Sequence, residues 1–182
     1  MVEEKIAIDG LVLLKPTIFS DERGVFLESY NKLKYDILID GPIEFMQDNI
    51  SISKKNILRG LHFQKQPMAQ GKLVQVIKGS VLDVAVDIRK SSPTYGQHYK
   101  VELSDINKLQ LWIPEGFAHG FISLEENTVF SYKCTNFYSK DDEMDLLWND
   151  PILNIDWGVE SPTLSEKDET ASKFSDFITP FK

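Results

Sequence analysis

Apolar and polar residues alternate along most of the chain with a period of two, the pattern of β-strands that bury one face. Strands of this kind are predicted at residues 73–77, 81–88, 98–103, 108–113, 119–124 and 128–137. A Lys-Gly-Ser triplet separates the first two, so we expect them to form a hairpin with a glycine in its turn. Many short strands at this spacing are typical of a sandwich or barrel, in which jelly-roll closure hides the strand edges. The pattern therefore predicts an all-β fold.

The strand predicted at 81–88 has two different faces. Its even-numbered positions are leucine, valine or isoleucine, whereas Asp83 and Asp87 lie at odd-numbered positions. Because successive side chains of a strand point to opposite faces, the two acids share one face. This face borders either a polar cavity or solvent, and the strand pattern does not choose between them.

Helical periodicity is scarce. Residues 31–39 predict a short helix that is ended by the Asp-Gly-Pro sequence at 40–42. A second short helix is predicted to begin after Ser165, with Ser165 as its N-cap and Asp168 at its third position. Helices are therefore expected to be few and short.

The C-terminal tail is rich in aromatic residues, with Trp157, Phe174, Phe177 and Phe181 after residue 151. Disordered tails rarely contain so many aromatic side chains. We expect this tail to pack onto the barrel or onto a partner subunit. A length of 182 residues fits one domain, so residues 1–182 are interpreted as a single domain.

Composition narrows the class of protein. The apolar fraction of 42% and the charged fraction of 26% are those of an ordinary globular chain. The net charge of −8 leaves no basic surplus to neutralise phosphates, which argues against general nucleic-acid binding. A single phosphorylated ligand, held by a few lysines and arginines, remains compatible with this charge.

The chain contains one cysteine, Cys134, which excludes an internal disulfide and a cysteine-based zinc site. Cys134 lies on a predicted strand and is expected to be a buried or half-buried thiol. The start of the chain lacks the apolar stretch of a signal peptide, and no run approaches the roughly 20 apolar residues of a membrane helix. We therefore expect a cytoplasmic protein without a membrane partner.

Two histidines lie in motifs that indicate chemistry. His119 follows a proline and a glycine in PEGFAHGF, which matches the later half of the cupin signature P-x-G-x-x-H, and His62 lies in RGLHFQ. Metal-binding cupins supply His-x-His and a glutamate in the earlier half. Here Gln64 replaces the second histidine, and no glutamate lies between His62 and Gly79. The remaining ligands make a poor transition-metal site, so no metal is predicted.

A histidine without a metal is available for proton transfer. Its ordinary pKa of about 6.5 leaves most of the ring neutral, and hence basic, at physiological pH. Arg59 and Lys72 lie close to His62 in sequence and could hold an anionic ligand or stabilise an oxyanion. Tyr132, on a predicted strand, is a candidate general acid if its phenol faces the same cavity.

Taken together, these motifs closely resemble the dTDP-4-dehydrorhamnose 3,5-epimerase family over nearly the whole chain. The most specific segments are LRGLHFQ, QGKLVQV and PEGFAHGF in this order and spacing. The others are FSDERGVFLES (19–29), QDNISISKKNI (47–57), IKGSVLDVAVDIRKSSPTYG (77–96), YKCTNFY (132–138), WNDP (148–151) and LSEKD (164–168). The resemblance implies a cupin-type jelly-roll β-barrel or sandwich, with a few short helices mainly near the C-terminus.

The resemblance also implies a homodimer that uses no metal or other cofactor and inverts C3 and C5 of dTDP-4-dehydro-6-deoxy-D-glucose. By position, His62 would be the base and Asp168 its orienting partner, with Asp83 as a second candidate for that role. Tyr132 would return a proton from the opposite side of the sugar ring. Lys72 would stabilise the enolate oxygen that forms at C4.

Further positions match the contacts of the family with its nucleotide sugar. They are Arg23, Glu28, Gln47, Asn49, Arg59, His119, Glu143, Lys167 and Tyr138, the last of which would stack on the thymine. Two positions depart from the family pattern: Ile50 stands where many members carry histidine, and Asn56 where glycine is common. Neither is one of the positions to which a catalytic role is carried over.

Three alternatives remain. A 3-epimerase, a 5-epimerase or a 3,4-ketoisomerase would differ in the placement of the acid and in the substrate pose, which one sequence does not resolve. A barrel that only binds a nucleotide sugar is disfavoured by the matched His62 and Tyr132 beside Lys72. A metal-dependent cupin oxygenase or isomerase is disfavoured by Gln64 and the missing glutamate.

Overall fold

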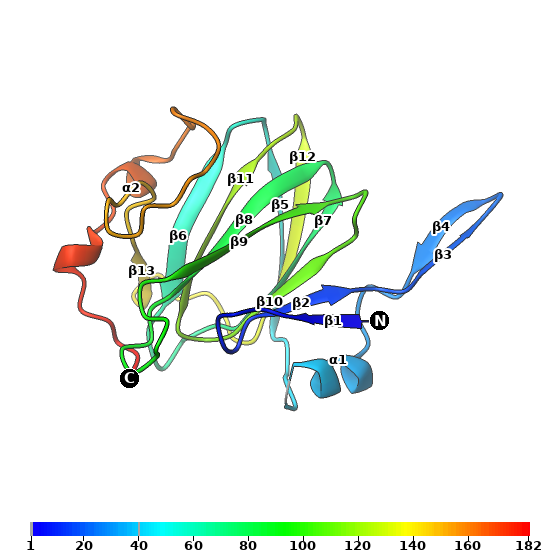
Figure 1. Ribbon diagram of the computed structural model, residues 1–182, viewed down its shortest axis with the longest axis horizontal. Coiled ribbons are helices and arrows are strands. Elements are labelled where there is room, and N and C mark those ends of the chain that lie inside the picture. Colours follow the sequence, from blue (N-terminus) through cyan, green and yellow to red (C-terminus); the bar gives the residue numbers. More distant parts are fainter. Residues whose placement is uncertain (1, 40) are drawn as a thin grey trace.

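The computed structural model describes residues 2–39 and 41–182, which form two β-sheets that face each other (Figure 1). The first sheet consists, in spatial order, of β1 (Val2–Lys5), β2 (Val12–Lys15), β10 (Gln110–Ile113), β7 (Lys72–Lys78), β12 (Thr128–Cys134) and β5 (Gln47–Ser53). The second consists of β13 (Glu143–Asp145), β6 (Leu58–Gln64), β11 (Phe117–Ser123), β8 (Ser80–Asp87) and β9 (His98–Ser104). The predicted all-β, jelly-roll class is confirmed.

Smaller elements lie around the two sheets. β3 (Ile18–Asp21) and β4 (Gly24–Leu27) pair only with each other and form a hairpin that projects away from the barrel (Figure 1). The helices are α1 (Lys32–Leu38), α2 (Glu166–Glu169) and the 3₁₀ turn Phe174–Asp176. Within the described residues, no helix is long and apolar enough to cross a membrane.

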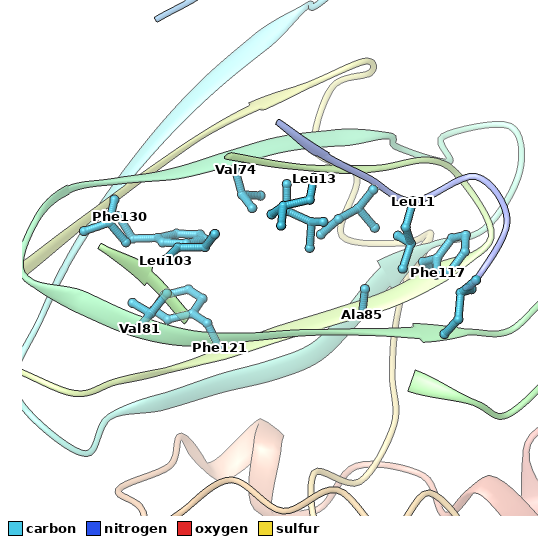
Figure 2. Packing of buried hydrophobic residues seen from close by; sticks show 13 residues of the cluster. Leu11, Leu13, Val74, Val81, Ala85, Leu103, Phe117, Phe121 and Phe130 are labelled. Carbon is cyan, nitrogen blue, oxygen red and sulfur yellow. The ribbon is translucent and has the colours of Figure 1, made fainter. Parts of the chain in front are cut away.

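The main hydrophobic core fills the space between the two sheets (Figure 2). Val74 and Phe130 enter it from the first sheet, and Ala85 and Phe121 enter it from the second. The rings of Phe121 and Phe130 stack with their centroids 4.1 Å apart, which joins the sheets at one end of the barrel. Burial of apolar surface on this scale is the main force that holds a sandwich together.

The other face of the second sheet is covered by the C-terminal tail. Val84 and Val86 of β8 pack in one cluster with Trp157 and the phenylalanines of the tail. The ring of Phe63 on β6 meets that of Phe177 edge-on at 5.6 Å. Of the two locations expected for the tail, the structure shows packing on the chain's own barrel, as Figure 1 illustrates.

The hairpin predicted around residues 78–80 is wrong. β7 pairs with β10 and β12, whereas β8 pairs with β11 and β9, so the chain changes sheets at Gly79. Gly79 has a φ of +81°, and a Cβ at this position would lie 2.7 Å from Oγ1 of Thr128. Alternation predicts the faces of a strand correctly, but the partner of each strand is decided by tertiary packing.

The acidic face of β8 points into the barrel and not to solvent. The side chains of Asp83 and Asp87 are both fully buried. Burial raises the pKa of Asp87, but hydrogen bonds from Arg89, Ser92 and Thr94 outweigh it and lower this pKa to about 2. Asp87 therefore organises the loop after β8, while Asp83 faces the site described below.

Both predicted helices are confirmed. Asn31 caps α1 by accepting a hydrogen bond from the backbone N–H of Lys34, and Ser165 caps α2 in the same way through the N–H of Asp168. The predicted Asp-Gly-Pro stop includes Asp40, which lies outside the described residues. Cys134 is buried, as expected.

Candidate active site

Two adjoining cavities open between the sheets and share the side chains of His62, Lys72 and Tyr132. The first, of about 350 Å³, is lined in addition by Ser51, Ile57, Leu58, Arg59, His119, Phe121, Phe130, Thr163, Leu164, Ser165 and Asp168. The second, of about 280 Å³, is lined in addition by Gln47, Asn49, Phe63, Gln64, Gln70, Tyr138 and Glu143. Most residues that the sequence singles out for chemistry or binding therefore meet at one place.

A close approach of two backbones aligns the two histidines. Gly60 has a φ of +136°, and a Cβ there would lie 2.4 Å from the Cα of Gly120 on β11. The pairing of β11 with β6 shifts register at this point, and His119 then pairs directly with His62. Side chains of directly paired residues point to the same face of a sheet, so both imidazoles face the first cavity.

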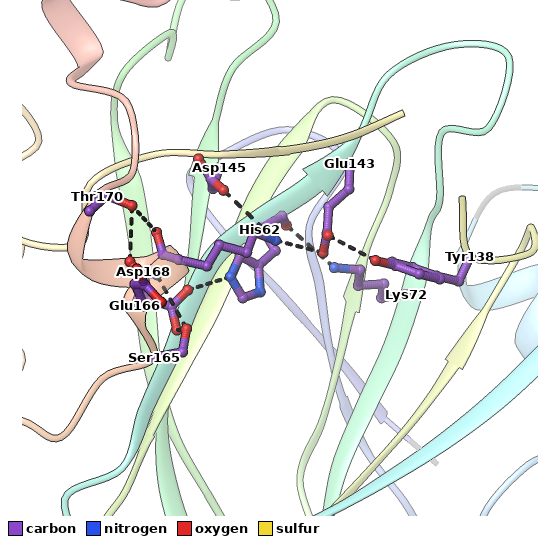
Figure 3. A network of polar contacts seen from close by, with 10 residues as sticks. His62, Lys72, Tyr138, Glu143, Asp145, Ser165, Glu166, Asp168 and Thr170 are labelled. Atoms are coloured by element: carbon purple, nitrogen blue, oxygen red, sulfur yellow. Dashed lines mark hydrogen bonds and ion pairs between the residues drawn. The ribbon is translucent and has the colours of Figure 1, made fainter. Parts of the chain in front are cut away.

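His62 is hydrogen-bonded to Asp168 of α2 (Figure 3). The Nε2 atom of His62 lies 2.5 Å from Oδ1 of Asp168, whose side chain is only 3% exposed. Burial raises the pKa of Asp168, but hydrogen bonds from His62 and Ser165 and the nearby Lys167 outweigh burial and lower this pKa. An ionised carboxylate can only accept, so the neutral ring carries its proton on Nε2 and its lone pair on Nδ1.

Asp83, the second candidate for the orienting carboxylate, does not contact His62. Its Oδ2 lies 2.9 Å from Nε2 of His119, and both side chains are buried. Burial lowers the pKa of His119, although Asp83 opposes this effect. His119 is therefore a neutral ring held at the wall of the cavity, where it also stacks on Phe130.

Lys72 and Tyr132 come from the first sheet and face His62 of the second. Nζ of Lys72 lies 3.4 Å from the backbone carbonyl oxygen of His62. Burial lowers the pKa of Lys72, while Asp83 and Glu143 act in the opposite direction. Burial also raises the pKa of the Tyr132 phenol, so this group keeps its proton and can donate it. An amine, a phenol and an imidazole thus line one space.

The second cavity contains a connected polar network (Figure 3). The hydroxyl of Tyr138 donates to Oε2 of Glu143 at 3.0 Å, and Nζ of Lys167 lies 2.8 Å from Oε1 of the same carboxylate. Gln47 accepts from the backbone N–H of Tyr138 at 2.8 Å and donates to Asn49 at 2.9 Å. Tyr138 is 54% exposed as a residue, so a planar base can reach its ring and stack on it.

Gln64 stands where metal-binding cupins carry a ligand, and its amide has a different task. Its Nε2 donates to the carbonyl oxygens of Met68 and Phe137, and its Oε1 accepts from the N–H of Ser139 at 2.8 Å. The side chain therefore holds the loop on both sides of Tyr138. Across residues 2–39 and 41–182, no group of three or more His, Cys, Asp and Glu side chains could hold a metal ion.

Arg23 and Glu28 do not reach either cavity of this chain. The Arg23 side chain, at the turn of the projecting hairpin, is 85% exposed and pairs with Asp21. Glu28 follows the hairpin and pairs with Lys34 of α1 at 2.7 Å. Of the nucleotide-sugar contacts expected from the sequence, these two are thus the ones that the fold keeps apart from His62.

Residues 5–176 match the family model described as dTDP-4-dehydrorhamnose 3,5-epimerase. The chain belongs to this family. It is 55% identical to the dTDP-4-dehydrorhamnose 3,5-epimerase of Salmonella typhimurium, over 94% of each chain.

Solved structures of the same family have the same fold. The enzyme of Elizabethkingia anophelis superposes with a TM-score of 0.92 at 49% identity, over 97% of each chain. An epimerase of Legionella pneumophila, solved in complex with dTDP-4-keto-L-rhamnose, superposes with a TM-score of 0.92 at 47% identity, over 96% of this chain and 93% of that chain. Family membership, expected from LRGLHFQ and its companion motifs, is confirmed.

Neither of the two departures from the family pattern, Ile50 and Asn56, lines a cavity of the site. Ile50 is 69% exposed, and neither cavity is lined by its side chain. Asn56 has a φ of +63°, in the left-handed region that asparagine tolerates better than most residues. The sequence did not identify Ser51, Phe121 and Phe130, which form part of the wall of the first cavity. On predicted strands, residues of these types are usually interpreted as packing residues.

Proposed function

We propose that the chain inverts C3 and C5 of dTDP-4-dehydro-6-deoxy-D-glucose and forms dTDP-4-dehydro-L-rhamnose. The observation that carries this proposal is the His62–Asp168 pair, which faces Tyr132 and Lys72 of the opposite sheet across one cavity. Relatives that carry the name of this activity, at about half identity over nearly the whole chain, support the same reaction.

In the proposed mechanism His62 removes a proton from the carbon next to the C4 ketone. The ketone acidifies the hydrogens on both neighbouring carbons, so this chemistry needs no cofactor. Nδ1 of His62 accepts the proton because Nε2 is occupied by Asp168. The imidazolium that forms is stabilised by the carboxylate of Asp168, which lies 2.5 Å from the ring.

Loss of the proton yields an enolate, and its oxygen needs a positive group nearby. The side chain of Lys72 lines both cavities, and in its protonated form it would attract the enolate oxygen more strongly there than in bulk water. Tyr132 then donates a proton to the carbon, and proton exchange with water afterwards returns the phenolate of Tyr132 and the imidazolium of His62 to their starting forms. Because Tyr132 belongs to the first sheet and His62 to the second, the proton arrives from the opposite side of the ring and the centre is inverted.

The nucleotide is proposed to occupy the second cavity, with the thymine on the exposed ring of Tyr138. Gln47, Asn49, Glu143 and Lys167 surround that position. Arg59 and His119 line the first cavity and would contact the sugar. We further propose that residues 1–182 act as one cytoplasmic domain.

A second copy of the chain is proposed to complete the site. The projecting hairpin exposes 60% of Phe19 and 69% of Phe26. On the outer face of β5, Ile50 and Ile52 are 69% and 67% exposed. Apolar patches of this kind mark protein interfaces, and a homodimer would cover them. Light scattering should give twice the mass of one chain.

Such a homodimer also explains the position of Arg23 and Glu28. Arg23 lies at the turn of the hairpin that extends beyond the chain's own barrel, and Glu28 directly follows this hairpin (Figure 1). A hairpin that packs on a neighbour would bring Arg23 to the partner's nucleotide, where its exposed guanidinium could bind a phosphate oxygen in a bidentate way.

The function is tested by incubating the chain with the 4-keto sugar nucleotide in heavy water and locating deuterium by NMR. Label at both C3 and C5 is the expected result. Label at one carbon would replace the proposal by a single epimerase. Tight binding without any label would contradict an enzymatic role, and it would favour a barrel that only binds the nucleotide sugar.

A further inference from the structure

The carboxylate of Asp168 has a second partner besides His62. While Oδ1 faces Nε2 of His62 at 2.5 Å, Oδ2 accepts a hydrogen bond from the hydroxyl of Ser165 at 2.8 Å (Figure 3). The same Ser165 oxygen accepts from the backbone N–H of Asp168 at 3.2 Å, which caps α2. One serine hydroxyl therefore caps the helix and binds the carboxylate that orients the base.

Two hydrogen bonds, one on each oxygen, fix the orientation of a carboxylate, whereas one hydrogen bond does not. The last torsion of an aspartate side chain is broad, so a single hydrogen bond to His62 leaves the carboxylate free to turn. A second hydrogen bond, on the other oxygen, fixes the plane of the group. It also leaves Oδ1 directed at His62, since Oδ2 is occupied.

Ser165 is itself held firmly against the strand that carries His62. The N–H of Leu58, the first residue of β6, donates to the carbonyl of Thr163 at 3.0 Å. The N–H of Thr163 donates to the carbonyl of Asn56 at 2.8 Å. Through these bonds the segment before α2 runs beside the start of β6, and Ser165 reaches the wall of the first cavity.

We propose that Ser165 is a positioning residue of this active site, which directs Oδ1 of Asp168 toward Nε2 of His62 and thereby keeps the lone pair on Nδ1. This inference rests on the proposed function for the role of His62. The hydroxyl donates its hydrogen to Asp168 and acts through that carboxylate, so its loss is expected to lower kcat and to leave KM nearly unchanged.

Three substitutions separate positioning from helix capping. Ser165→Thr keeps both the cap and the hydroxyl donor. Ser165→Ala removes both. Ser165→Asp keeps the cap, because aspartate and serine are equally good N-caps, but it offers no donor and places a negative charge beside Asp168. Ser80→Ala is a matched control, since the Ser80 hydroxyl also donates to a carboxylate, that of Glu125, at 2.8 Å.

The expected kinetic result follows from the value of a hydrogen bond to a charged group. Ser165→Thr should retain kcat within about twofold, and Ser165→Ala should lose about tenfold or more with KM within about twofold. Ser165→Asp should be at least as slow as Ser165→Ala, although its cap preserves the unfolding temperature. Ser80→Ala should leave kcat unchanged. Wild-type kcat in Ser165→Ala or in Ser165→Asp would reduce Ser165 to a helix cap and overturn the proposal.

A spectroscopic measurement tests the inference independently of turnover. The chain has three histidines, so ¹⁵N-labelled histidine spectra of the full chain can be assigned by substitution. At a pH where the ring is neutral, His62 should be protonated on Nε2 in the wild type and in Ser165→Thr. Ser165→Ala should increase the fraction protonated on Nδ1, and an unchanged tautomer would contradict the proposal. If the wild type introduced no deuterium into the sugar, the proposed function would fail, whereas the tautomer result would still stand.

Discussion

Replacing Asp168 by asparagine removes one negative charge beside His62 and keeps the size of the side chain. In the folded chain the carboxylate is 3% exposed and its Oδ1 lies 2.5 Å from Nε2 of His62. When His62 takes a proton from the sugar, its positive charge forms against this carboxylate. Two unit charges about 4 Å apart interact by ~4 kcal/mol at an effective dielectric constant of about 20. The amide oxygen of asparagine recovers part of this energy, so kcat of Asp168→Asn should fall by about 10²–10³-fold.

The amide can also turn and offer its NH₂ group to Nε2. The neutral ring would then carry its proton on Nδ1, which removes the lone pair that the mechanism uses. Either orientation of the substituted amide weakens the base. Neither changes the second cavity, where Tyr138 and Glu143 lie, so KM should change little.

The assay is steady-state kinetics together with the rate of deuterium incorporation at C3 and C5. Asp156→Asn is the control, because the Asp156 side chain is 80% exposed and pairs with Lys100, and neither residue lines either cavity. Its kcat should equal that of the wild type. If Asp168→Asn keeps kcat within about threefold of the wild type while remaining folded, the carboxylate does not support the base and the reasoning is refuted.

Three further predictions follow from the same geometry. Tyr132→Phe removes the proton donor and His62→Ala removes the base, so each variant should fold normally and lose about 10²–10⁴-fold in kcat. An active Tyr132→Phe would show that another group is the acid. Gln64→Met leaves the two backbone groups that flank Tyr138, and the carbonyl of Met68, without the partner that Gln64 supplies. KM should therefore rise about tenfold with kcat nearly kept, and an unchanged KM would show that the loop at Tyr138 does not need the amide. The pKa of Asp87 is lowered from 3.8 to about 2, so its contribution of ~2 kcal/mol is present above about pH 4 and lost as the pH falls toward 2. Urea unfolding from pH 6 to pH 2.5 should show this loss, and Asp87→Asn should show less of it.

Part of the fold follows from local pattern. The alternation along β8 correctly predicts which side chains share a face, although it leaves open whether the acidic face borders a cavity or solvent. The serine before Glu166 correctly predicts the start of α2. The pairing of β8 was not predictable, because a one-residue corner at Gly79 and a tight hairpin look alike in sequence. β6 was missed as a strand, since Arg59 and Gly60 interrupt its apolar pattern at the point where β11 comes closest.

Some residues of the candidate site were also predicted from local motifs, whereas the contacts between them were not. His62 and His119 were identified from motifs, whose spacing is set by the strands that carry them. The choice between Asp83 and Asp168 as the carboxylate that orients His62 depended on a tertiary contact, because His62 and Asp168 are 106 residues apart in the sequence. No local pattern encodes a distance of this kind. The position of Arg23 on a hairpin that leaves the barrel is likewise a property of the fold.

The stereochemistry of the proposed substrate agrees with a single base and a single acid. In a D-glucose ring with a C4 ketone, the hydrogens on C3 and C5 are both axial and lie on the same face. A base fixed on that face reaches either hydrogen by a small shift of the ring, while Lys72 can follow the oxygen on C4, which lies between the two carbons. In the proposed mechanism Tyr132, on the other sheet, would serve the opposite face for both carbons. Between the two inversions, proton exchange with water must return His62 to its neutral form and Tyr132 to its phenol. With that exchange one His62–Asp168 pair suffices for two inversions, and the deuterium experiment should find both carbons labelled.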